Sequence, residues 1–184
     1  MVNNLGMELF LQKNKVMKNF TFILLIAAAA ASSMPQRVLS CTGITLTAKD
    51  SSRIVARTIE WGGSNLHSQY VIVPRGYEQY SYVPETNGSG MKFTARYGYV
   101  GLAVEQKEFI AEGLNEAGLS AGLFYFPGYG KYEEYNPSLR TSSIADLQLV
   151  SWILGNFTNV DEVKDAIRRV HVVSIDPVSY THLR

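Results

Sequence analysis

The sequence predicts an α+β fold in which antiparallel strands pack against helices. Segments rich in β-branched and aromatic residues, many with alternating apolar and polar positions, fill residues 41–126. Two segments with helical spacing of apolar residues follow, and a further strand begins near residue 171. Strands followed by helices are typical of a sheet that is covered on one face. With 184 residues, 46% hydrophobic and 18% charged, the composition indicates one globular domain.

The first two predicted strands, 41–48 and 53–61, form a hairpin. The first alternates apolar with small residues, which is the pattern of a half-buried strand, and a Lys-Asp-Ser-Ser turn separates the two. Because the strands of a hairpin run antiparallel, residues near its open end lie close together. The hairpin therefore brings Arg57 and Glu60 toward Cys41.

The remaining elements follow from the same patterns. Strands are expected at 69–74, once within 76–90, on both sides of Gly98 or Gly101 within 91–104, at 109–114, at 118–126 after an Asn-containing turn, and from 171. Ser142 or Ser143 is expected to cap a helix that runs through Asn156, and Asn159 to cap one over 160–170.

Residues 1–40 have the features of a signal peptide. Met17 and Lys18 precede an apolar run, 20–31, that is too short to span a bilayer comfortably. Small residues then allow cleavage between Ser40 and Cys41. We therefore expect translation to start at Met17, with the segment before it an over-extension, and export to the periplasm or beyond. The alternative is an N-terminal helix retained as a membrane anchor.

Cys41 is the only cysteine, so the chain cannot form an internal disulfide. Three interpretations remain open. The residue is a buried structural cysteine, a lipid-modified cysteine of a β-rich binding lipoprotein, or an N-terminal catalytic nucleophile.

Cleavage before Cys41 would place an α-amine and a thiol on one residue. Their ordinary pKa values are about 7.7–8.0 and about 8.5, so the amine can accept the thiol proton. Glu60 could anchor that amine and Arg57 could stabilise the thiolate. The two side chains could equally form an ordinary surface ion pair. Candidates for an apolar wall around the scissile bond are Trp61, Phe124, Tyr125 and Phe126, although Tyr125 could be a plain core aromatic.

Several functions are disfavoured by the sequence. Residues 41–184 carry 13 basic and 15 acidic residues, because four of the 17 basic and one of the 16 acidic residues lie in 1–40. This balance, without a basic run, disfavours nucleic acid as a partner. His67, His171 and His182 lack metal-ligand spacing, and no phosphate loop is present. We therefore expect neither a metal nor a cofactor.

Three motifs together resemble the choloylglycine hydrolase family, which includes bile salt hydrolases and penicillin V acylases. They are Cys41-Thr42-Gly43, Ala56-Arg57-Thr58-Ile59-Glu60-Trp61 and Gly113-Leu114-Asn115-Glu116-Ala117-Gly118-Leu119. The segments Leu154-Gly155-Asn156-Phe157 and Val160-Asp161-Glu162-Val163 also resemble that family. The resemblance extends from residue 41 to about residue 177.

The resemblance implies an N-terminal nucleophile hydrolase fold of four layers, αββα. It implies that Cys41 is the nucleophile, that Arg57 lies beside its sulfur, and that Tyr125 helps to form the oxyanion hole. Tyr at that position is similar to penicillin acylases, whereas residues 124–129 otherwise resemble the bile salt hydrolases. The position of Glu60 is usually Asp in the family, so this chain departs there by one methylene group.

The resemblance also implies that the chain is the N-terminal part of a longer enzyme. The family's second half supplies an oxyanion Asn and a further active-site Arg, both beyond Arg184, and residues 178–184 do not resemble the expected continuation. The implied activity is hydrolysis of conjugated bile salts, with penicillin V or N-acyl homoserine lactones as alternative small-molecule amide substrates. We expect a homotetramer by resemblance, and no activity from this chain alone.

Overall fold

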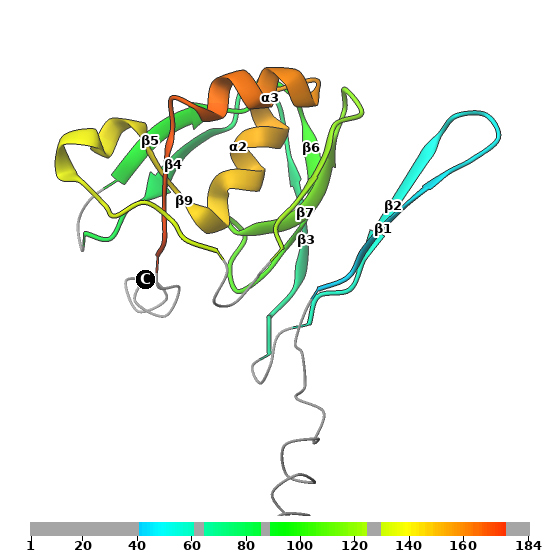
Figure 1. Cartoon of the computed structure of the whole chain (residues 1–184), viewed down its shortest axis with the longest axis horizontal. Coiled ribbons are helices and arrows are strands. Elements are labelled where there is room, and N and C mark those ends of the chain that lie inside the picture. The colour runs from blue at the N-terminus through cyan, green and yellow to red at the C-terminus, as the bar shows by residue number, and fades with distance from the viewer. Residues whose placement is uncertain (1–40, 61–64, 86–88, 125–129, 176–184) are drawn as a thin grey trace, which may run out of the picture. The chain divides into compact units, whose positions relative to one another are not determined.

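The computed structural model describes residues 41–60, 65–85, 89–124 and 130–175 (Figure 1). The expected signal peptide, residues 1–40, lies outside the described residues. The strands are β1 (Gly43–Thr47), β2 (Arg53–Arg57), β3 (Gln69–Val73), β4 (Glu78–Tyr82), β5 (Ser89–Thr94), β6 (Tyr99–Ala103), β7 (Ile110–Asn115), β8 (Ser120–Gly122), β9 (Ser143–Ala145) and β10 (His171–Val173). The helices are α2 (Leu149–Asn156) and α3 (Val160–Ile167), with 3₁₀ turns η1 (Pro137–Ser142) and η2 (Asp146–Gln148).

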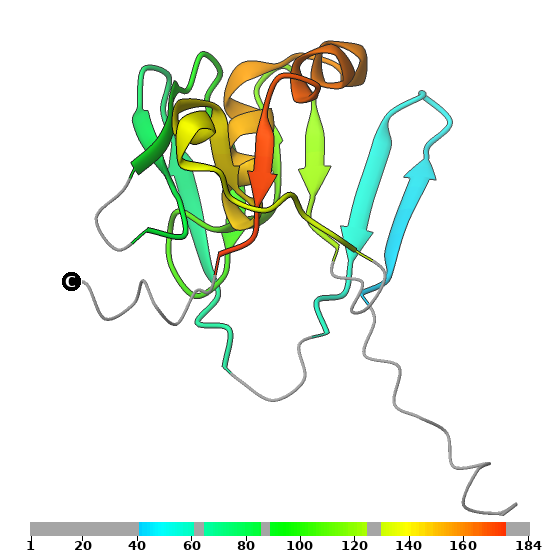
Figure 2. The same cartoon turned by 60° about the vertical axis from the view of Figure 1, so that its left-hand side comes forward.

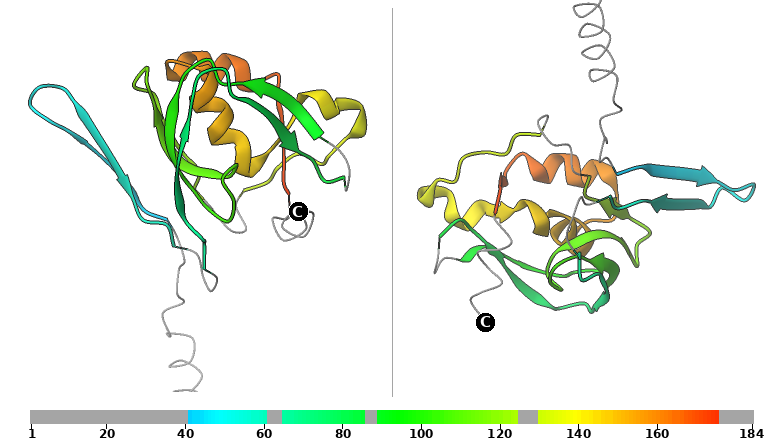
Figure 3. Two further views of the ribbon diagram at one scale, coloured as in Figure 1. Left: turned by 180° about the vertical axis from the view of Figure 1, so that it is seen from behind. Right: turned by 90° about the horizontal axis from the view of Figure 1, so that it is seen from below.

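A four-stranded antiparallel sheet, in the order β3-β6-β7-β8, carries α2 on one face. The views from behind and from below show α2 and α3 on the same side of this sheet (Figure 3). The core between them consists of buried apolar side chains from both layers: Val73, Ala95, Tyr99, Ala103, Ile110, Val150 and Leu154. The helix lies so close that a Cβ atom on Gly113 would be 2.6 Å from the Leu154 Cδ1 atom.

A second core lies against other side chains of α2. Trp152 packs there with Phe93 of β5 and Ile144 of β9. Strands β9 and β10 pair in parallel, and the helices α2 and α3 form the connection between them. Helix α2 is therefore packed against the four-stranded sheet and also against β5 and β9.

The β1–β2 hairpin is almost entirely exposed. Figures 1 and 2 show its turn standing away from the other strands, and every residue of β1 is exposed. The predicted hairpin and its turn are confirmed. The predicted half-burial is wrong, because the described part of the chain leaves Ile44 51% and Leu46 56% exposed.

The outer face of the four-stranded sheet is similarly open and apolar. Tyr70 is 86% exposed, and Ile72, Val100 and Leu114 are also exposed. Pairing aligns Ile72 with Val100 and Val100 with Leu114, so these side chains share one face. The sheet thus has one face buried under α2 and one apolar face that no described element covers fully.

The α+β layout and most predicted elements are confirmed, but the start of the first helix is wrong. Residues from Ser143 form β9 because they pair with β10, and α2 begins only at Leu149. The Ser143 Oγ donates to the Leu139 carbonyl 2.9 Å away, which is in the turn before it rather than in a helix after it. Asn159 does cap α3, since its Oδ1 accepts from the Glu162 amide at 3.0 Å.

Asn115, at the end of β7, joins the turn between β7 and β8 to the last turn of α2. Its Nδ2 donates to the carbonyls of Leu154 at 2.9 Å and Phe157 at 2.7 Å. Its Oδ1 accepts from the amides of Ala117 and Leu119. This buried side chain therefore uses its donors and its acceptor to hold the turn against the helix.

Asp146 is a buried carboxyl group that begins η2. Its Oδ1 accepts from the Leu147 amide at 2.9 Å and the Ile175 amide at 3.4 Å. Burial raises the pKa of Asp146, and these hydrogen bonds only partly oppose that shift. A raised pKa means that the folded state binds the proton more tightly than the unfolded state does.

We predict that Asn115→Ala lowers the free energy of unfolding by about 3 kcal/mol, because several buried groups lose their partners together. Urea denaturation measures this loss. Asn136→Ala is the matched control, since the exposed Asn136 side chain only caps η1 and its loss should cost about 1 kcal/mol or less. Equal losses in the two variants would contradict the role given to Asn115.

We predict that Asp146→Asn raises Tm at pH 7. The wild-type carboxyl destabilises the folded chain once pH exceeds its ordinary pKa, so the gain should shrink as pH falls toward that value. Thermal unfolding between pH 4 and pH 7 measures the trend. Asp50→Asn should show the opposite direction at neutral pH, because hydrogen bonds from Ser52 lower the pKa of Asp50. A gain for Asp146→Asn that did not depend on pH would exclude this explanation.

Candidate active site

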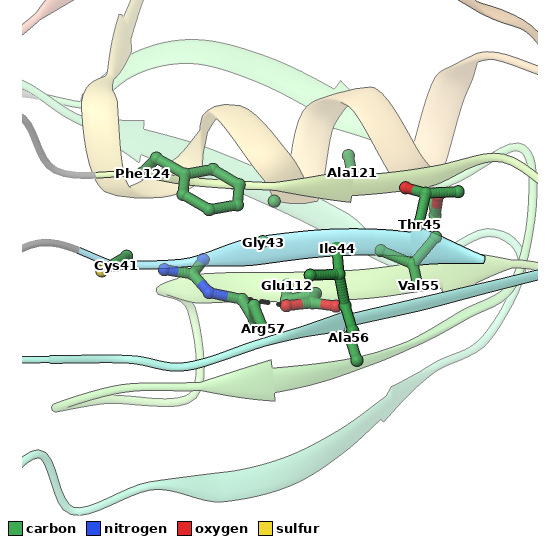
Figure 4. A pocket seen from close by; sticks show the side chains of 12 residues that line it. Cys41, Gly43, Ile44, Thr45, Val55, Ala56, Arg57, Glu112, Ala121 and Phe124 are labelled. Carbon is green, nitrogen blue, oxygen red and sulfur yellow. Dashed lines mark ion pairs between the residues drawn. The ribbon is translucent and has the colours of Figure 1, made fainter.

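The hairpin register places Cys41 and Arg57 at the same end of the hairpin. Gly43 pairs with Arg57, and the Thr58 amide donates to the Thr42 carbonyl at 2.9 Å. Cys41 precedes this last pair of residues. Cys41 and Arg57 line one pocket with a volume of about 470 Å³ (Figure 4).

The Arg57 side chain reaches from the hairpin to the β7–β8 arm. Its Nη1 donates to the Leu123 carbonyl at 2.5 Å and to the Ala111 carbonyl at 3.2 Å. The side chain is only 5% exposed. A cation this deeply buried needs partners of this kind, because an unpaired buried charge is strongly destabilising.

Phe124 covers the guanidinium and also packs on β1. The Arg57 Cζ atom lies 4.4 Å from the centre of the Phe124 ring, which is a cation–π distance. A Cβ atom on Gly43 would be 2.6 Å from the Phe124 Cζ atom. Glycine at position 43 therefore leaves room for the ring to pack against the β1 backbone while it also covers the guanidinium.

Glu112 of β7 is a member of this pocket that sequence reasoning missed. Its Oε2 lies 3.6 Å from the Arg57 Nε. In Figure 4 the Nη end of the guanidinium is directed toward Cys41, and Glu112 lies on the Nε side. One signal was available, since Glu112 is the single charged residue in the apolar strand that sequence reasoning placed at 109–114.

The other predicted site residues are placed differently. Glu60 is exposed, accepts from the Thr58 Oγ1 at 3.3 Å, and is not among the described residues that line the pocket of Cys41. Trp61, Tyr125 and Phe126 lie outside the described residues. The structure therefore brings together Cys41, Arg57 and Phe124 of the predicted set.

The described residues offer neither a metal site nor a membrane-spanning helix. No group of three or more His, Cys, Asp and Glu side chains in these ranges is arranged to hold a metal ion. Within the same ranges, no helix has both the length and the apolar character needed to cross a membrane.

A known family profile matches most of the chain. The profile described as linear amide C–N hydrolases, choloylglycine hydrolase family, matches residues 41–182. The chain belongs to the choloylglycine hydrolase family. The resemblance of its motifs is thereby confirmed, and the members of this family are amide hydrolases.

Relatives within the choloylglycine hydrolase family include two bacterial proteins named bile salt hydrolase/transferase. The protein from Clostridium perfringens is 29% identical over 142 residues, which are 76% of this chain and 40% of that protein. The protein from Bifidobacterium longum subsp. longum is 31% identical over 134 residues, 73% of this chain and 41% of that protein. The chain thus spans about 40% of the length of these relatives.

Solved structures support the same family fold. A mutant of the conjugated bile acid hydrolase from Clostridium perfringens matches with a TM-score of 0.59 at 26% identity, covering 75% of this chain and 40% of that one. The penicillin V acylase from Agrobacterium tumefaciens matches with a TM-score of 0.60 at 20% identity, covering 73% and 40%. The second likeness shows the fold alone.

We predict that Arg57→Ala loosens the hairpin from the β7–β8 arm, because the two carbonyls and the Glu112 carboxylate lose their common cation. Hydrogen exchange of the β1 and β2 amides should become on the order of tenfold faster. Arg53→Ala, at the exposed far end of β2, is the control and should leave the exchange rates unchanged. Similar rates in wild type and Arg57→Ala would show that this side chain does not hold the hairpin.

Proposed function

We propose that the whole protein hydrolyses a non-peptide amide bond with Cys41 as an N-terminal nucleophile. The observation that carries the proposal is the pocket in which the chain's only cysteine and a buried guanidinium lie together. Membership of a family of amide hydrolases supports the reaction class. A cation near a thiol stabilises the thiolate, which is the reactive form.

Removal of residues 1–40 during export is the first step of this proposal. Cleavage before Cys41 frees an α-amine whose ordinary pKa lies close to that of the thiol. The amine then accepts the thiol proton, directly or through one water molecule. In this scheme Glu60 binds the amine, as first expected from the sequence, and Arg57 lies beside the sulfur.

The thiolate then attacks the amide carbonyl carbon and forms a C–S bond. The carbonyl oxygen becomes an oxyanion, for which Tyr125 is the proposed donor from this chain. Collapse of the intermediate breaks the C–N bond, and the protonated α-amine gives its proton to the leaving amine. Water attacks the resulting thioester, releases the carboxylic acid and regenerates Cys41.

Conjugated bile salts are the substrate class that we propose first, with glycine or taurine as the leaving amine. The relatives that cover most of this chain are named for bile salts. Penicillin V or an N-acyl homoserine lactone is the alternative. The exposed Phe124 ring, together with Trp61 and Phe126, would supply apolar surface for the acyl group in either case.

We also propose that this chain is part of a four-layer αββα domain whose remaining strands come from a longer protein. The open apolar faces of the hairpin and of the four-stranded sheet support this, because such surface is normally buried. The 184-residue chain would then lack part of its active site and would be inactive alone. The family resemblance also suggests a homotetramer of the whole protein.

Hydrolysis of glycocholate, taurocholate and penicillin V by the whole protein tests the function. Cys41→Ala should abolish turnover with little loss of stability, and Cys41→Ser should slow it at least about 100-fold, because a hydroxyl is far less acidic than a thiol. Arg53→Ala is the control and should retain activity. Turnover by Cys41→Ala at the wild-type rate would reject the nucleophile.

Mass spectrometry of the mature N-terminus tests the processing step. A chain that begins with an unmodified Cys41 supports the amidase, and a diacylglyceryl group on Cys41 supports the lipoprotein alternative. A variant that retains its leader should be inactive, because its Cys41 nitrogen is then part of a peptide bond.

A further inference from the structure

We propose that Glu112 is a positioning residue that orients the Arg57 guanidinium toward Cys41. This inference rests on the proposed function, because it assigns to Arg57 the task of stabilising the Cys41 thiolate. Glu112 lies on β7, in a different hairpin from Cys41 and Arg57. Its role therefore depends on how the two hairpins meet.

Contacts on several sides hold the Arg57 guanidinium. The carbonyls of Ala111 and Leu123 accept from Nη1, and the Phe124 ring covers one flat face. The Nε donates to the Thr58 carbonyl at 3.4 Å, and the Glu112 carboxylate forms an ion pair on the same side, with its Oε2 3.6 Å from Nε. With Nη1 and Nε both engaged, the free rotation of the group is restricted and its Nη end stays directed toward Cys41 (Figure 4).

Glu112 also supplies a negative charge that offsets the desolvation cost of burying the Arg57 guanidinium. Arg57 and Glu112 are the charged residues among the described lining of the pocket, and Glu112 is 23% exposed against 5% for Arg57. Glu60, the other nearby carboxylate on the chain, contacts Thr58 instead. A buried guanidinium without a counter-ion would tend to move toward water, away from the thiol.

Removal of the Glu112 charge should shift the pH at which Cys41 becomes reactive, and the direction of this shift differs between a positioning role and a simple charge effect. A carboxylate near a thiol makes ionisation of the thiol harder, so its removal alone would lower the pH at which Cys41 becomes reactive. Removal of a residue that aims the cation has the opposite result, because the thiolate loses its stabilising partner. The sign of the change therefore separates positioning from simple charge.

The test is alkylation of Cys41 by iodoacetamide in the 184-residue chain, followed by mass spectrometry across pH. Cys41 is the only cysteine of this chain, so the modification reports one site. In Glu112→Gln the midpoint of the pH profile should rise by about one pH unit, which makes alkylation near neutral pH about tenfold slower. The rate at the high-pH plateau reports access to the thiol and should change little.

Glu116→Gln is the matched control. Glu116 follows the same strand and also pairs with an arginine, Arg75, at 2.6 Å, but it does not line the pocket. Its midpoint should equal that of the wild type. In Arg57→Ala the midpoint should also rise, and adding Glu112→Gln to Arg57→Ala should raise it no further. If Glu112→Gln does not fold, Glu112→Asp, which withdraws the carboxylate by one methylene, should move the midpoint in the same direction.

The outcomes separate the two proposals. A midpoint that is unchanged or lower in Glu112→Gln, or in Glu112→Asp if that variant is used, overturns the positioning role. If Arg57→Ala raises the midpoint while the Glu112 variant does not, only this inference fails. If Arg57→Ala itself leaves the midpoint unchanged, the pairing of Arg57 with the Cys41 thiolate fails, and the role given to Glu112 fails with it.

Discussion

The buried guanidinium of Arg57 is the interaction on which the arrangement of the site depends. In the described part of the chain, β1 and β2 pair only with each other, so no ladder of backbone hydrogen bonds joins them to the main sheet. The carbonyls of Ala111 and Leu123 supply that connection through one side chain. The Ala111 carbonyl also accepts from the Leu123 amide, so the bond that continues the β7–β8 pairing shares its acceptor with the arginine.

The β7–β8 hairpin is fixed at both of its ends, and this gives the arginine a rigid support. At the turn, Asn115 bonds the backbone of α2, while at the open end the backbone accepts from Arg57. Glu116, next to Asn115, pairs with Arg75 and accepts from the Gly98 amide. The Asn-Glu pair of the family motif is thus used here to build the support, away from the pocket.

Much of the fold could be predicted because its signals are local. Alternation and turn residues located the hairpins, and the Asn159 cap located α3. The start of α2 could not be found in this way. Ser143 resembles a helix cap, whereas its strand exists because His171–Val173 pairs with it from 28 residues further along the chain. Glu112 stands out as the one charged residue of an apolar strand, but its pairing with Arg57 could not be predicted, since the meeting of two hairpins is not encoded near either residue.

The open β1–β2 hairpin has a consequence for the handling of this polypeptide. Both outer edges of the hairpin carry backbone groups without a strand partner in the described region, and its apolar side chains face solvent. Such an edge is a template for strands of a neighbouring molecule. At high concentration, copies of this chain would therefore be expected to associate through these strands, and Cys41, which precedes β1, would then lie beside the resulting intermolecular sheet.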